Sequence, residues 1–139
     1  MIYFDNAATT RVDEKVTNSM TKYLSDEFGN PTSKYYQKAE KAEEAVKNSR
    51  NKIAEYLNCK PEEIIFTSGA TESNNFIIKG VADYYKNKGK HIITSKGEHK
   101  ATLESCKFLK EKGFNITYLP LNENGSINIT HLKNNIRQH

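Results

Sequence analysis

The sequence predicts an α/β protein in which mainly parallel strands are flanked by helices. Apolar runs at 64–66, 91–95 and 114–119 are short enough for strands, and longer segments between them repeat their apolar residues every three to four positions. Strands that alternate with helices of ten or more residues are joined by right-handed crossovers, with helices on both faces of the sheet. Three short strands would make only a small part of such a sheet.

Two helices are expected before the first strand, at 13–25 and 33–57. Asp13 can cap the first, because a side-chain carboxylate accepts hydrogen bonds from the free N–H groups of a helix start. Gly, Asn and Pro residues then break the pattern, and Thr32 or Ser33 can cap the second helix. One face of this longer helix is expected to be buried and the other solvated.

The stretch 62–75 is predicted to contain a strand, a tight turn and a helix start. Ile64–Phe66 is too short for a helix, and Gly69 allows a sharp turn. Thr71 and Ser73 are both plausible caps for the helix that follows. Free N–H groups and partial positive charge at a helix start suit a phosphate. The alternative is that one of the two hydroxyls merely caps a helix of an ordinary α/β unit.

The remaining segments continue the alternation of helices and strands. In order they are a helix ending before Gly89, a strand at 91–95, a helix at 99–113, a strand at 114–119, a turn at 122–125 and a last helix. The first of these helices is rich in apolar residues and is expected to be well buried. Thr130 is expected to cap the last one, whose pattern still runs at His139.

Composition narrows the class of protein. The 139 residues are 36% hydrophobic and 27% charged, which is ordinary for a folded domain. The net charge is +4, but lysines alternate with acidic residues, so neither nucleic acid nor a membrane is the expected partner. Cys59 and Cys106 lie far apart without metal-ligand spacing, so they are interpreted as structural thiols and no metal is expected. With no signal-like segment, a reducing, cytoplasmic location is expected.

Four stretches, taken together, closely resemble the cysteine desulfurases, which are pyridoxal-phosphate enzymes of the class V aminotransferase group with fold type I. These stretches are Tyr3–Thr10, Phe28–Ser33, Phe66–Asn74 and Glu98–Ala101. Their order and spacing match the family over nearly the whole chain, which is more specific than any one motif. The resemblance implies that residues 1–139 are the N-terminal third of such an enzyme, a truncated piece holding the start of the small domain and the first part of the large cofactor-binding domain.

The resemblance also implies roles for individual residues. The family's Ser-Gly-Ala-Thr-Glu turn binds the phosphate of pyridoxal 5'-phosphate, which places that role on Ala70 and Thr71. The family's Glu-His motif supplies a histidine that stacks on the pyridine ring and serves in proton transfer, which makes His99 both a cofactor-binding and a catalytic residue. Asn6–Thr10 and Gly29–Ser33 correspond to segments that approach the active site in the family, and plain packing is their alternative.

The complete enzyme implied by this resemblance converts L-cysteine to L-alanine. It passes the sulfur as a persulfide to acceptor or scaffold proteins, for iron-sulfur cluster assembly or thiolation, and it is a homodimer. The family's Schiff-base lysine and nucleophilic cysteine lie beyond residue 139, and neither Lys100 nor Cys59 nor Cys106 matches them. The chain by itself is therefore expected to be inactive.

Two other interpretations stay open at the level of sequence. The chain can be a non-catalytic module or half of a split enzyme, binding a complementary polypeptide. It can also belong to another class V enzyme, such as a selenocysteine lyase, because these motifs bind the shared cofactor and discriminate poorly between substrates.

Overall fold

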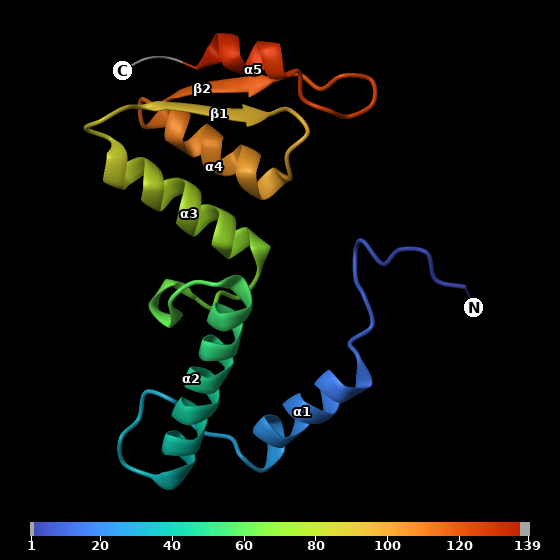
Figure 1. Cartoon of the computed structure of the whole chain (residues 1–139), viewed down its shortest axis with the longest axis vertical. Coiled ribbons are helices and arrows are strands. Elements are labelled where there is room, and N and C mark those ends of the chain that lie inside the picture. The colour runs from blue at the N-terminus through green and yellow to red at the C-terminus, as the bar shows by residue number, and fades with distance from the viewer. Residues whose placement is uncertain (1, 137–139) are drawn as a thin grey trace. The chain divides into compact units, whose positions relative to one another are not determined.

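The computed structural model describes residues 2–136 as two compact units, which join between Ile65 and Phe66 (Figure 1). Unit 1 contains α1 (Glu14–Ser25), α2 (Gln37–Leu57) and the short 3-10 helix η1 (Pro61–Glu63). Unit 2 contains α3 (Ala70–Tyr85), β1 (His91–Ser95), α4 (Lys100–Glu111), β2 (Asn115–Leu119) and α5 (Ile129–Asn135).

The caps in unit 1 agree with the sequence prediction for α1 but not for α2. Asp13 Oδ1 accepts a hydrogen bond of 2.8 Å from the Lys15 N–H, as expected. The predicted cap of α2 at Thr32 or Ser33 is wrong, since Tyr36 occupies the N-cap. Thr32 is instead held in the preceding loop, where its N–H and hydroxyl both donate to Asn30 Oδ1. This local turn competes with helix formation and delays the start of α2.

The buried face of α2 is made of small side chains. Ala39, Ala42 and Ala54 are buried, as the expected one-sided pattern requires. Asn58 ends the helix in the left-handed conformation with φ 53°. Beyond it, Arg50 Nε donates to the Ile64 carbonyl at 3.2 Å, so α2 also holds the segment after η1.

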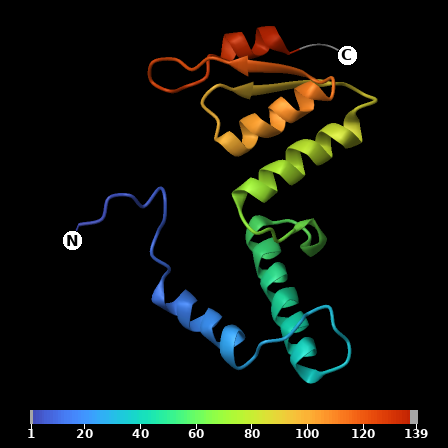
Figure 2. The same cartoon turned by 180° about the vertical axis from the view of Figure 1, so that it is seen from behind.

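Unit 2 has the predicted α/β architecture. β1 and β2 pair in parallel, from His91 opposite Asn115 to Ser95 opposite Leu119. Figures 1 and 2 show α5 on one side of the two strands and α4 on the other, with α3 beside α4. The core between α4 and the strands contains Cys106, whose pKa is raised first by burial and then by the negative charge of Glu98.

The first predicted strand, at 64–66, does not form. Ile64–Phe66 lies between η1 and α3 outside any ladder, and Ile65 is 60% exposed. A strand needs a neighbouring strand to pair with, and the sheet described within residues 2–136 consists of β1 and β2. The strand-forming composition of this run is therefore not sufficient to make it a strand.

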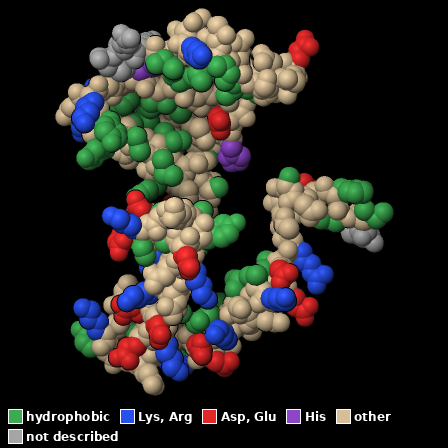
Figure 3. Space-filling model, in the orientation of Figure 1, with side chains coloured by type: hydrophobic (Ala, Val, Ile, Leu, Met, Phe, Trp, Pro, Cys, Tyr) green, Lys and Arg blue, Asp and Glu red, His purple; other side chains and the backbone are tan. Residues whose placement is uncertain are grey.

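The prediction that α3 is well buried is also wrong. Ala82 is its one buried residue among those described, whereas Ile77 is 60% and Val81 52% exposed. Figure 3 shows hydrophobic side chains gathered on the surface of unit 2. A helix of this composition needs a broad sheet to cover it, and the two strands described here are too few.

The end of the described chain departs from the prediction in its cap. Asn128, not Thr130, occupies the N-cap of α5, and its Oδ1 accepts from the His131 N–H at 3.0 Å. The helix ends at Asn135 instead of continuing, and residues 137–139, including His139, lie outside the described part. No helix within residues 2–136 is long and apolar enough to cross a membrane.

Candidate functional site

The start of α3 leaves backbone donors available. Gly69 is the N-cap and makes no side-chain cap, so the prediction that Thr71 or Ser73 caps this helix is wrong. The first N–H to reach a helical acceptor is that of Ser73, which donates to the Gly69 carbonyl at 3.1 Å. The N–H groups of residues 70–72 therefore precede the hydrogen-bond ladder of the helix. They form the positive end of its dipole.

Two side-chain contacts hold the turn before α3. Glu72 Oε2 accepts from the Ser68 N–H at 2.6 Å and from the Ser68 hydroxyl at 2.7 Å. These bonds, the backbone one first, lower the pKa of the Glu72 carboxyl. The hydroxyls of Thr67 and Ser73 lie 2.7 Å apart. Sequence reasoning missed both contacts, although the i,i+4 spacing of Ser68 and Glu72 could have indicated the first.

Thr71 and Ala70 lie at this exposed turn, where the resemblance placed phosphate binding. Within the described residues, the Thr71 hydroxyl makes no hydrogen bond, while its carbonyl accepts from Asn75 Nδ2 at 2.9 Å. The small side chain of Ala70 leaves the backbone N–H groups accessible. A hydroxyl beside free N–H groups at a helix start is the donor set that a phosphate monoester needs, so these residues fit that group.

His99 is the N-cap of α4. Its Nδ1 accepts from the Ala101 N–H at 3.1 Å, which fixes the ring against the first turn of the helix. When the ring is neutral, the hydrogen must then reside on Nε2. The residue is exposed, so its Nε2–H can donate a hydrogen bond or a proton to a bound molecule. A planar imidazole held in this way can stack on an aromatic ring and move a proton.

The fold brings these two sites to the same end of unit 2. Figures 1 and 2 show α3 and α4 both beginning at the side where β1 ends. In parallel α/β sheets, ligands bind outside the carboxyl ends of the strands. Ala70, Thr71 and His99 thus share the expected edge. The segments 6–10 and 29–33, which sequence reasoning considered for the same site, belong to unit 1.

These segments of unit 1 have well-defined local structure. In 6–10, the Thr10 hydroxyl donates to the Asn6 carbonyl at 2.8 Å. In 29–33, Gly29 lies against the backbone of α2, where a Cβ would come within 2.3 Å of the Lys38 carbonyl oxygen. Packing thus explains Gly29 without any ligand.

Comparison with known proteins decides the family. A family profile described as "Aminotransferase class-V" matches residues 2–139. The chain belongs to the class V aminotransferase family. Class V aminotransferases, including the cysteine desulfurases, are pyridoxal-phosphate enzymes. The fold-type I, truncated α/β architecture expected from the sequence is confirmed by the solved structures that this class V chain resembles.

Relatives of this class V chain are cysteine desulfurases. The IscS cysteine desulfurase of Buchnera aphidicola subsp. Baizongia pistaciae is 55% identical over 99% of the chain and 34% of its own length. A solved structure of a NifS-like protein has a TM-score of 0.92 at 39% identity, over 99% of this chain and 37% of that one. SspA, solved in complex with cysteine, has a TM-score of 0.87 at 44% identity, over 97% and 39% of the two chains.

The class V chain spans about a third of the length of the curated relatives that it matches. This partial coverage agrees with the N-terminal portion expected from the sequence.

Proposed function

We propose that this chain is the N-terminal part of a pyridoxal-phosphate-dependent cysteine desulfurase. The observation that carries the proposal is its 55% identity with IscS over almost its whole length, combined with a phosphate-type turn and a fixed histidine at one edge of the sheet. The complete protein would convert L-cysteine to L-alanine and pass the sulfur as a persulfide to acceptor or scaffold proteins. That sulfur would serve iron-sulfur cluster assembly or thiolation.

Unit 2 is proposed as the beginning of the cofactor-binding domain, and unit 1 as the start of the small domain. The Thr71 hydroxyl and the N–H groups of residues 70–72 would hold the phosphate of pyridoxal 5'-phosphate, helped by the dipole of α3. When bound, the cofactor supplies an electron sink for carbanion chemistry. Ser68 and Glu72 would keep the turn in shape, because their mutual hydrogen bonds close it independently of the ligand.

His99 is proposed to stack on the cofactor ring and to hold or move a proton at Nε2. The Ala101 N–H supports this role, because it occupies Nδ1 and orients the ring. The lysine that binds the cofactor and the nucleophilic cysteine would come from residues beyond 139. We also propose that the complete protein is a homodimer. A reducing, cytoplasmic location is proposed as well, and the two free cysteines among the described residues support it.

The proposal is tested first on cofactor binding by the native protein that contains this chain. T71A should bind pyridoxal 5'-phosphate about 10- to 100-fold more weakly, since one hydrogen bond to a charged group is lost. The affinity for pyridoxal, which has no phosphate, should not change. T130A, at an exposed threonine of α5, is the matched control. An equal loss for both ligands would refute phosphate recognition by Thr71.

Catalysis is tested separately, by the release of L-alanine from L-cysteine. H99Q should keep the affinity for the cofactor within a few-fold and reduce the rate by about 10²–10⁴, the range that general acid-base groups contribute. A rate close to wild type would contradict the role of His99. A strong preference for selenocysteine over L-cysteine would favour the alternative that the protein is a selenocysteine lyase.

A second candidate is half of a split enzyme. It is favoured by the exposed apolar residues of α3 and by the coverage of one third of each relative. The intact mass of the native gene product decides between a split enzyme and one continuous enzyme. A mass near 15.9 kDa, together with capture of a polypeptide that carries the missing lysine, would support the split form. A mass about three times larger would support one continuous enzyme.

A further inference from the structure

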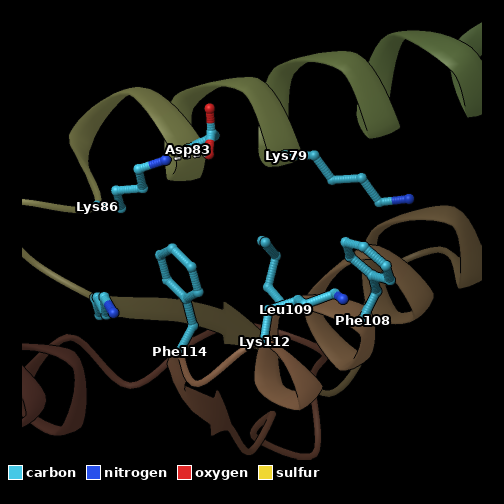
Figure 4. A pocket seen from close by; sticks show the side chains of 8 residues that line it. Lys79, Asp83, Lys86, Phe108, Leu109, Lys112 and Phe114 are labelled. Carbon is cyan, nitrogen blue, oxygen red and sulfur yellow. Dashed lines mark hydrogen bonds and ion pairs between the residues drawn. The ribbon is translucent and has the colours of Figure 1, made fainter.

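A pocket of about 370 Å³ lies between the second half of α3 and the end of α4 (Figure 4). Phe108, Leu109 and Phe114 point into it toward α3 and provide its apolar lining. Leu109 is buried, and Phe108 is 41% exposed. The volume lies at the lower end of the range for ligand sites, so the pocket can accept one apolar side chain and the groups beside it.

The rim of the pocket is strongly basic. Lys79, Lys86, Lys90 and Lys112 line it, with Asp83 as the single acidic residue. Lys86 Nζ lies 3.0 Å from Asp83 Oδ1, which neutralises one lysine. In the described part of the chain, the other three lysines have no carboxylate within ion-pair distance. Their excess positive charge surrounds an apolar floor.

Helix capping explains only part of this charge. Lys86 and Lys112 are the C-caps of α3 and α4, where cations favour the helix dipole. Lys79 lies in the interior of α3, and Lys90 lies in the loop before β1. The Nζ atoms of Lys79 and Lys112 lie 4.6 and 5.6 Å from the centre of the Phe108 ring. Two cations are thus held over one apolar group.

The pocket is separate from the candidate cofactor turn. Thr71 lies in the first turn of α3, and Lys79 follows two turns later, about 12 Å along the helix axis. The lysines therefore have no place in the proposed phosphate site. Sequence reasoning missed this cluster, because its four lysines are spread over residues 79–112 and meet only when α3 packs beside α4.

We propose that this pocket binds an acidic peptide segment of a partner protein, with one aliphatic or aromatic side chain in the pocket and carboxylates on either side. The charge complementarity is direct, because three unpaired lysines surround the floor. Lys79 and Lys86 lie at opposite ends of the pocket in Figure 4 and are separated by about 10 Å along α3. Such spacing fits acidic groups distributed along a peptide better than it fits one compact anion.

The test uses the native protein and a fluorescent peptide that carries one leucine between two pairs of acidic residues. Binding is followed by fluorescence anisotropy and should weaken as the ionic strength rises from ~0.05 to ~0.5 M. A peptide of the same charge with serine in place of leucine should bind at least about fivefold more weakly, because the apolar floor is then unused. Equal binding of both peptides, or equally effective competition by inorganic phosphate, would overturn the proposal.

Three variants connect binding with the pocket. K79E/K112E should weaken binding of the leucine peptide by about tenfold, whereas K110E makes a charge reversal on α4 outside the pocket and should change it less than about twofold. D83N frees Lys86 and should tighten binding about two- to threefold. If K110E weakens binding as much, per reversed lysine, as K79E/K112E does, the peptide is attracted to the basic surface in general. That result would refute the site. This test needs neither cofactor nor activity, so its failure leaves the proposed function unaffected.

Discussion

Individual residues in this chain are restricted by backbone atoms that come very close. At Gly29 an added Cβ would lie 2.3 Å from the Lys38 carbonyl oxygen and 2.7 Å from the carbonyl carbon. These are backbone atoms of α2, so they cannot move aside as a flexible side chain does. At Gly80, in α3, an added Cβ meets nothing within 4 Å. Replacing each of these two glycines by alanine is therefore expected to have opposite effects on stability, so the two variants form a matched pair.

G29A should lower the free energy of unfolding of the native protein by about 1–3 kcal/mol, the usual cost of overpacking. G80A should leave it unchanged or raise it by about 0.5–1 kcal/mol, because alanine is a better helix former at this exposed position. Chemical denaturation measures both. An equal stability of G29A and wild type would show that the loop at 29–33 does not pack against α2 as described.

Glu72 provides a prediction about pH. The Ser68 N–H and hydroxyl lower the pKa of its carboxyl from the ordinary value of 4.5. A lowered pKa in the folded state stabilises the protein above the ordinary value, and this contribution disappears as pH falls through the folded value. E72Q should therefore be less stable than wild type at neutral pH, and the difference should shrink in acid.

The direct measurement is an NMR titration of the Glu72 carboxyl. Glu72 in the wild-type protein should titrate below 4.5. In S68A it should titrate between the wild-type value and 4.5, because this variant loses the Ser68 hydroxyl but keeps the backbone N–H. Titration of Glu72 at its ordinary value in wild type would contradict the geometry of the turn.

At the scale of elements, α3 exposes apolar side chains that a larger sheet would normally cover. Phe76, Ile77 and Val81 are all more than half exposed, and the sheet beside this helix has two strands in the described chain. Exposed apolar surface and unpaired strand edges both promote association. The behaviour of the 139-residue chain in solution should therefore depend on this helix.

The isolated chain is expected to self-associate in sedimentation experiments. I77D/V81D should shift it toward monomer by reducing the exposed apolar area of α3. L24D, at an exposed leucine of α1, serves as the control and should have a smaller effect. If the wild-type chain sediments as a monodisperse monomer at every concentration tested, this expectation is wrong.

At the scale of the whole molecule, the proposed desulfurase would need more groups than the candidate site of this chain contains. It spans about a third of each curated relative, and its candidate site contains a phosphate-type turn and a histidine. A pyridoxal enzyme also needs a lysine that binds the cofactor, and a desulfurase needs a nucleophilic cysteine. Cys106 is buried with a raised pKa, which suits a structural thiol and not a nucleophile.

The 139-residue chain supplied with pyridoxal 5'-phosphate and L-cysteine should therefore release no L-alanine beyond the free cofactor. The measurement is chromatographic detection of alanine, with the native protein as the positive control. Alanine production by the isolated chain above the free-cofactor level would contradict the assignment of the missing groups to the remainder of the protein.

The sequence by itself determined the features that depend on local chemistry. Asp13 caps α1, Gly113 ends α4 with φ 88°, and β1 and β2 form where apolar strand patterns lie between helices. The four motifs at 3–10, 28–33, 66–74 and 98–101, taken together, were sufficient to identify the family. These features could be predicted because each depends on residues close together in the chain.

Only the tertiary structure decided features that depend on distant neighbours. The run 64–66 has strand-forming residues but no ladder within the described chain, and α3 has an apolar composition but few residues to cover it. Thr130 and Asn128 both belong to the residue types that favour N-caps, and the position of the first helical turn selects Asn128. The lysine-rimmed pocket exists because α3 packs beside α4, which brings Lys79 to the Phe108 ring that Lys112 at the end of the same helix already faces. Pairing, burial and shared contacts are properties of chain segments brought together by folding, so no local pattern specifies them.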